Sequence, residues 1–338
     1  MPRSSQVSAN YFAVIFKKLI VKTNLVILLL LASVIVFSIL NPIFISSTNI
    51  SNLSTQVVFL LLITVGQMLV LITGGFDLSV GAVTALTSIT SAMVMASVSN
   101  GGTENVALAI TLGLLAALGI GLICGIINGV TVSLLKVNPF IATLATASIF
   151  QGATLLLSSG QQISGIPMSF VIGFGSGDVF GIPALLIAAI PAILIVAFFV
   201  IFQPYGKALY AIGGNEKAAH VTGIPITKYV SLTYLTCSVL TAFGAWLLTA
   251  RVSAGQPLLG SAFPLESITA AIIGGASLRG GRGGIGGAIG GAIFVVMLSN
   301  GMDLARLGSN WQMVTLGVVL IASVIIDVKK EQWRKQVF

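Results

Sequence analysis

Charged residues are scarce in this chain. Only 7% of its 338 residues are Asp, Glu, Lys or Arg, whereas 56% are hydrophobic. Soluble globular domains carry about 25% charged residues, so the composition excludes a water-soluble protein. Long apolar runs that lack charge are typical of proteins that cross a membrane several times. We therefore expect an all-α integral membrane protein in which residues 1–338 form a single transmembrane domain.

The residue types that build catalytic and metal sites are also rare. The chain contains one histidine, His220, and two cysteines, Cys124 and Cys237, which both lie in apolar segments. So few cysteines and histidines exclude a disulfide framework and a Cys/His metal cluster. The sequence also lacks the GxxxxGK[ST] loop that holds nucleotide phosphates. We expect no catalytic residue, no metal and no cofactor, so a membrane-embedded enzyme is disfavoured.

Apolar segments of about the length needed to cross a membrane recur along the chain. A helix needs about 20 residues to cross ~30 Å of hydrocarbon. Ten segments approach or exceed this length: residues 25–44, 56–73, 79–98, 106–135, 140–157, 182–202, 229–250, 265–278, 285–302 and 311–326. Five spans in each half are the pattern of an inverted repeat of two five-helix halves. The two halves share only faint sequence similarity.

The basic residues indicate an orientation. With the N-terminus inside, all of the 16 Lys and Arg residues except Arg251 and Arg306 fall in cytoplasmic segments. This positive-inside bias places both termini in the cytoplasm, as a segment over residues 1–24 and a tail over residues 327–338. It also accounts for the net charge of +8, so no nucleic-acid partner is expected and the lipid bilayer is the surrounding solvent.

The longest polar interruption covers residues 204–228, which this orientation places in the cytoplasm. Asn215 is a suitable N-cap for a short helix over residues 216–222, and Gly223 provides a left-handed stop. Small side chains share one face of that helix: Ala218, Val221 and Thr222. A helix this short is marginal by itself in water. It is either a connector packed against its own membrane domain or an exposed helix that contacts a cytoplasmic partner.

A glycine-marked stretch at residues 74–81 separates two expected spans and contains Asp77 and Ser79. Either side chain can cap the helix that follows. The stretch is therefore a tight cytoplasmic hairpin with a capping aspartate or a broken helix beside a transport path, and both interpretations stay open. Neutral amides within the spans, Gln67 and Asn128, either join helices to one another or contact a hydroxyl-rich solute.

A second glycine-rich stretch covers residues 264–302. Its first apolar segment is short for a crossing and is interrupted by Gly274 and Gly275, and such segments are the best sequence indicators of a transport path. Glu266, at the outer end of this segment, is either a cap or a gate. Glycines spaced four apart favour close approach of helix backbones: Gly283, Gly287 and Gly291.

Three stretches resemble the membrane permeases of bacterial ribose-type ABC sugar importers. They are GGFDLSVGAVTAL (residues 74–86), YGKALYAIGGNEKAAHVTGIP (205–225) and SITAAIIGGASLRGGRGGIGGAIGGAI (267–293). The run RVSAGQP, which contains Gln256, is also similar, and the resemblance extends from about residue 42 to residue 330. This chain departs from the family at Phe263-Pro264, where relatives commonly carry an acidic residue beside a tyrosine.

The resemblance implies a permease subunit in a bacterial cytoplasmic (inner) membrane that pairs with a second copy or a paralogue. A soluble binding protein would deliver a sugar, and a separate cytoplasmic ATPase would drive its import. The implied ATPase-coupling residues are Gly213, Gly214, Asn215, Glu216, Ala218, Ala219 and Gly223. The candidate translocation path comprises Gln67, Asp77, Ser79, Asn128, Gln256, Glu266, Gly274 and Gly275.

An ion-coupled secondary transporter of a small polar solute is the alternative function. Such transporters usually carry ionisable residues inside the membrane. Carboxylates are nearly missing from the expected spans, which disfavours this alternative.

Overall fold

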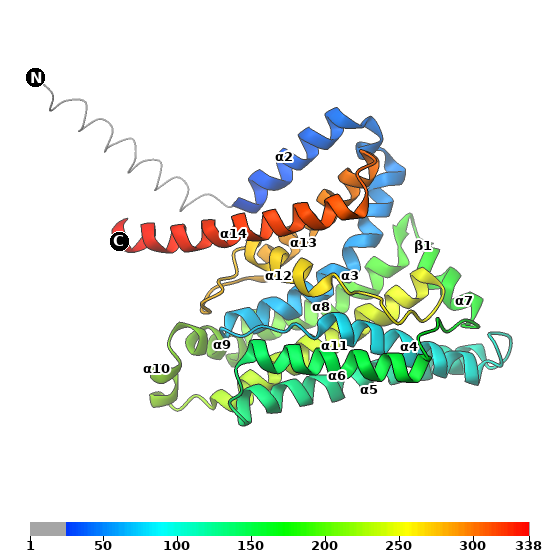
Figure 1. The fold of residues 1–338 in the computed structure, drawn as a ribbon, viewed down its shortest axis with the longest axis horizontal. Helices are drawn as coiled ribbons and strands as arrows, with labels where there is room; N and C mark the ends of the chain where they lie inside the picture. Colours follow the sequence, from blue (N-terminus) through cyan, green and yellow to red (C-terminus); the bar gives the residue numbers. More distant parts are fainter. Residues whose placement is uncertain (1–24, 338) are drawn as a thin grey trace, which may run out of the picture.

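The computed structural model describes residues 25–337 of the chain (Figure 1), and it describes side chains over residues 26–329. The N-terminal segment expected in the cytoplasm, residues 1–24, lies outside the described residues, as do most side chains of the expected C-terminal tail.

Helices dominate the described residues. The α-helices are α2 (Leu25–Leu40), α3 (Ser47–Ile72), α4 (Val80–Val98), α5 (Val106–Gly129), α6 (Pro139–Ser158), α7 (Met168–Phe170), α8 (Ala184–Phe202), α9 (Pro204–Gly214), α10 (Glu216–Val221), α11 (Ile226–Val252), α12 (Phe263–Ile273), α13 (Ile285–Leu304) and α14 (Ser309–Val337). A 3₁₀-helix, η1 (Pro42–Ile45), two π-helical turns, η2 (Val130–Leu134) and η3 (Val171–Ser176), and a hairpin of β1 (Asp178–Val179) and β2 (Ile182–Pro183) complete the fold.

Eight helices of the described residues are long and apolar enough to cross a membrane. They are α3, α4, α5 with η2, α6, α8, α11, α13 and α14, and they confirm the prediction of an all-α multi-pass membrane protein. The other two expected spans form helices of 16 residues (α2) and 11 residues (α12), which are shorter than the ~20 residues of a full crossing.

Helix α3 lies at the centre of the fold. Of its most apolar 18-residue window, 94% is buried, compared with 6% for α14. Helix α3 contacts α11 on one side and α12 and α13 on the other, so it joins the lower and upper groups of helices in Figure 1. The two cysteines, Cys124 and Cys237, are free and buried within the described bundle.

Two glycines bring α12 and α13 into backbone contact. A Cβ atom on Gly287 would lie 1.9 Å from the carbonyl oxygen of Gly274, and one on Gly291 would lie 1.9 Å from that of Ala270. This confirms close helix packing at Gly287 and Gly291. Gly283 precedes α13 and therefore does not belong to the packed helix face.

The short helix α10 and the β1–β2 hairpin lie at opposite ends of the bundle (Figure 1). Helix α8 runs from the hairpin to α9, which leads into α10. Its 19 residues span ~28 Å. By the expected orientation, α9 and α10 lie on the cytoplasmic side and the hairpin lies outside.

Candidate functional site

Local capping interactions define both ends of α10. The Asn215 side-chain oxygen accepts a hydrogen bond of 3.0 Å from the Ala218 N–H, as an N-cap does. At the other end Gly223 has a φ of +82°, and the Ile224 N–H donates to the Ala219 carbonyl oxygen at 3.1 Å. This is a Schellman motif. The helix ends at Val221, one residue before the predicted end, because Thr222 is its C-cap.

The two alanines of α10 face opposite environments. Ala219 is only 4% exposed and packs against the chain itself, whereas Val221 is 85% exposed. Ala218 and Thr222 are also exposed, so the predicted small face is free. Ala219, which the resemblance implies as a partner contact, is a contact within the chain, because packing of α10 on α9 turns it inward.

Glycines at the end of α9 serve different purposes. A Cβ atom on Gly213 would lie 1.7 Å from the Ile72 carbonyl oxygen, whereas nothing lies within 4 Å of one on Gly214. Gly213 therefore allows α9 to pack against the end of α3 and does not present a surface to a partner. Gly214 is exposed and stays available.

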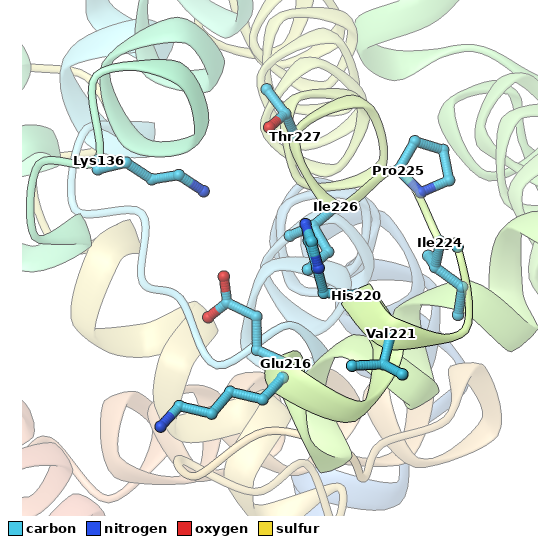
Figure 2. Close-up of a pocket in the computed structure, with 10 residues that line it drawn as sticks. Lys136, Glu216, His220, Val221, Ile224, Pro225, Ile226 and Thr227 are labelled. Atoms are coloured by element: carbon cyan, nitrogen blue, oxygen red, sulfur yellow. The ribbon is translucent and has the colours of Figure 1, made fainter.

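A groove of about 1060 Å³ runs between α10 and the turn after η2. Figure 2 shows Lys136 on one wall and Glu216 on the other, with the amino group and the carboxylate facing the space between them. The start of α11, at Ile226 and Thr227, also lines the groove. Lys136 has a φ of +56°. It was not predicted as a site residue, although it is the single lysine between two expected spans and this position could have indicated it.

A smaller cavity of about 290 Å³ shares Lys136, Glu216 and Ile226 with this groove and reaches Gly75 and Tyr234. The Tyr234 hydroxyl donates to the Phe76 carbonyl oxygen at 3.1 Å. The cavity therefore ends beside the non-helical connection between α3 and α4. Sequence inspection missed Tyr234, although a tyrosine within an expected span usually needs a hydrogen-bond partner.

Four of the predicted path residues meet in one buried polar cluster. The Asp77 carboxylate accepts hydrogen bonds from the Ser79 N–H at 2.9 Å and from the Ser79 hydroxyl at 2.6 Å. The Asn128 amide nitrogen donates to the Ser79 hydroxyl at 2.7 Å, and its oxygen accepts from Thr146 at 2.6 Å. Oriented to satisfy its partners, the Gln67 amide pairs with both the N–H and the C=O of Asp77 at 3.2 Å.

The cluster supports a part of each interpretation of residues 74–81, and a place beside a transport path stays a prediction. Asp77 does hold the start of α4 through Ser79, but it is fully buried, so the connection is not an exposed hairpin. Non-helical backbone inside a membrane domain is tolerated where protein surrounds it and satisfies its polar groups. Gln67 and Tyr234 do this for Asp77 and Phe76.

The remaining predicted path residues lie outside this cluster. Glu266 lies in the first turn of α12, and Ala262 occupies the N-cap position, so Glu266 is not the N-cap residue. Its part as a gate stays a prediction. The Gln256 N–H donates to Ser88 at 3.3 Å and fixes the loop on α4. Gly274 packs on α13, and Gly275 has a φ of +94°. None of these four residues is hydrogen-bonded to the cluster within the described residues.

The chain matches proteins of related sequence over most of its length. The family described as the permease component of branched-chain amino acid transport systems matches residues 49–324. The ribose import permease protein RbsC of Bacillus subtilis is 40% identical over 88% of this chain and 90% of its own length. The D-allose permease AlsC of Escherichia coli is 33% identical over 87% of this chain and 88% of its own length. No solved structure matches the chain.

A third relative is also a sugar permease. The L-arabinose transport system permease protein AraH of Escherichia coli is 30% identical over 88% of this chain and 87% of its own length. The relatives' names concern sugars, and they favour the importer over the ion-coupled alternative. The predicted resemblance is confirmed: this chain belongs to the ribose-type permeases of ABC sugar importers.

Proposed function

We propose that this chain forms the translocation pathway for a monosaccharide in the inner membrane of a bacterium. It acts with a second permease copy or a paralogue, a soluble sugar-binding protein and a cytoplasmic ATPase. The relatives are named for ribose, allose and arabinose, which are monosaccharides of five or six carbons, so a pentose or hexose is the expected cargo. The observation that carries the proposal is α10, a helix of six residues that is capped at both ends and displayed beside an open groove.

The ATPase would dock on the exposed face of α10. Its contacts would be Ala218, which is exposed, and Glu216 and Val221, which line the groove opposite Lys136 (Figure 2). Gly214, Asn215 and Gly223 would act through the position and ends of the helix. Docked groups can then move α10 as a rigid body, because a side-chain cap fixes its first turn and backbone hydrogen bonds fix its last.

Helix α9 would transmit this movement to the bundle. The Tyr210 hydroxyl donates to the Gly283 carbonyl oxygen at 2.9 Å, and the Gly281 N–H donates to the Ile72 carbonyl oxygen at 2.8 Å. A tyrosine hydroxyl is protonated at neutral pH, so it can donate, and burial raises the pKa of Tyr210 further. A shift of α9 would therefore act on the loop between α12 and α13 and, through that loop, on the end of α3. A two-state switch requires contiguous contacts of this kind.

The buried polar cluster would control the α3–α4 connection during this switch. In Asp77→Asn the remaining side-chain oxygen can still accept both Ser79 donors, but an NH2 group replaces the oxygen that faces the Asn128 amide nitrogen at 3.5 Å, so two donors oppose each other. We expect uptake to fall more than the amount of folded permease. Equal loss of protein and uptake would support a purely structural role for Asp77.

Uptake by proteoliposomes tests the function directly. Vesicles holding the permease and its ATPase should accumulate labelled ribose, allose or arabinose only when ATP is inside and the binding protein outside. Uptake driven by an ion gradient without ATP would refute the proposal.

A further inference from the structure

The β1–β2 hairpin exposes an aromatic side chain at a strained turn. Its register pairs Asp178 with Pro183 and Val179 with Ile182, which leaves Phe180 and Gly181 as the two turn residues. Their φ angles are +55° and +79°, as a type I′ turn requires. Asn, Asp or Gly usually occupies the first position, whereas a bulky residue at positive φ is an outlier. Backbone strain of this kind is concentrated at functional sites.

The hairpin tip is apolar and unpacked. Phe180 is 100% exposed, and its neighbours Val179 and Ile182 are about half exposed. The turn itself is well formed, because the Asp178 carboxylate accepts a hydrogen bond of 2.9 Å from the Gly181 N–H. The chain thus holds a phenyl ring away from its own surface on a defined turn.

A polar pocket of about 150 Å³ adjoins the base of the hairpin. Asp178 and Pro183 belong to both the hairpin and the pocket, and Ser51, Asn52 and Arg251 also line the pocket. The Arg251 side chain donates to the Gly175 carbonyl oxygen at 3.1 Å and remains exposed. Its other guanidinium N–H groups are suited to a carboxylate of a partner.

An aromatic cluster makes the base of this surface rigid. The ring centroid of Trp246 lies 4.7 Å from that of Phe170 and 5.2 Å from that of Phe174. Phe174 also lines the pocket. A rigid base lowers the entropy lost when a partner binds.

We infer that the hairpin tip and the Arg251 pocket together dock the soluble sugar-binding protein, an inference that rests on the proposed function. Phe180 inserts into an apolar depression of that protein, and Arg251 pairs with one of its carboxylates. Aromatic residues and arginine are the commonest binding hot spots. Burying the tip in lipid fits less well, because membrane interfaces favour Trp and Tyr and residues 177–183 carry Asp178 and no basic residue.

The test uses the full permease–ATPase complex in nanodiscs, titrated with binding protein loaded with the sugar that supports uptake. For Phe180→Asn we expect the half-maximal concentration for ATPase stimulation to rise at least about tenfold. Asparagine tolerates positive φ, so the melting temperature should stay equal or rise. Phe180→Tyr, the matched control, should behave like the wild type. Arg251→Gln should raise the half-maximal concentration and weaken its dependence on salt.

Three other outcomes would overturn the inference. A wild-type complex that no binding protein stimulates would refute the proposed function, and the inference with it. Stimulation of Phe180→Asn at wild-type concentrations would refute the inference alone. The chain has three native tryptophans, so the emission of Phe180→Trp is read as the difference from the wild-type spectrum. A difference spectrum that is blue-shifted in nanodiscs and unchanged by loaded binding protein would place the tip in lipid.

Discussion

Helices α9 and α10 follow one another in the chain, yet the structure holds them in opposite ways. Helix α9 is packed through Gly206, Ala208, Leu209 and Ile212, which are buried. Helix α10 buries only Ala219 and is held mainly by its caps. The difference shows that one continuous polar segment contains a helix packed into the bundle, α9, and a helix exposed on its surface, α10. Substitutions should therefore separate folding from coupling within a few residues.

The largest effect is expected at the end of α9. In Gly213→Val the new Cβ atom would lie 1.7 Å from the Ile72 carbonyl oxygen, and overpacking of this kind costs about 3 kcal/mol or more. We expect loss of folded permease, measured by size-exclusion chromatography in detergent. Gly214→Ala is the matched control, since nothing lies within 4 Å of its Cβ position. Normal amounts of Gly213→Val would show that α9 is as free as α10.

The two alanines of α10 give the sharpest contrast. Ala219→Leu should destabilise the protein by about 2 kcal/mol, because it overfills a packed position. Ala218→Leu should leave the melting temperature unchanged but reduce ATPase pull-down and sugar-stimulated ATP hydrolysis. The hypothesis of a displayed helix fails if Ala218→Leu retains wild-type association with the ATPase.

A smaller effect is expected at the helix stop. Gly223 has a φ of +82°, so Gly223→Ala should cost roughly 1–2 kcal/mol of left-handed strain and should loosen α10. Gly223→Asn should lose less, since asparagine tolerates this conformation. Hydrogen exchange of the α10 amides would measure the loosening, and equal exchange in both variants would contradict the assigned stop.

The smallest effect should come from Tyr210→Phe. It removes one hydrogen bond to Gly283, which is worth about 1 kcal/mol. If α9 transmits movement, the ratio of sugar imported to ATP hydrolysed should fall while ATPase docking stays intact. An unchanged ratio would show that this bond only stabilises the fold.

Sequence information was sufficient wherever structure depends on near neighbours. Caps and glycine stops act within a few residues, so the start of α10 was predicted correctly and its end to within one residue. Residues 67, 77, 79 and 128 were each predicted as path residues. The sequence did not predict that they form one cluster, because this depends on how three helices pack. For the same reason the inward side of α10, and the parts played by Thr146 and Tyr234, became apparent only in the structure.

The burial of both native thiols has a practical consequence for spectroscopy. Maleimide reagents reach exposed cysteines, whereas Cys124 and Cys237 are enclosed in the described bundle. The native chain can therefore serve as a nearly silent background for site-directed labelling. Labelling of Ala218→Cys and Phe180→Cys would measure whether these two exposed positions become protected when the ATPase and the binding protein are added.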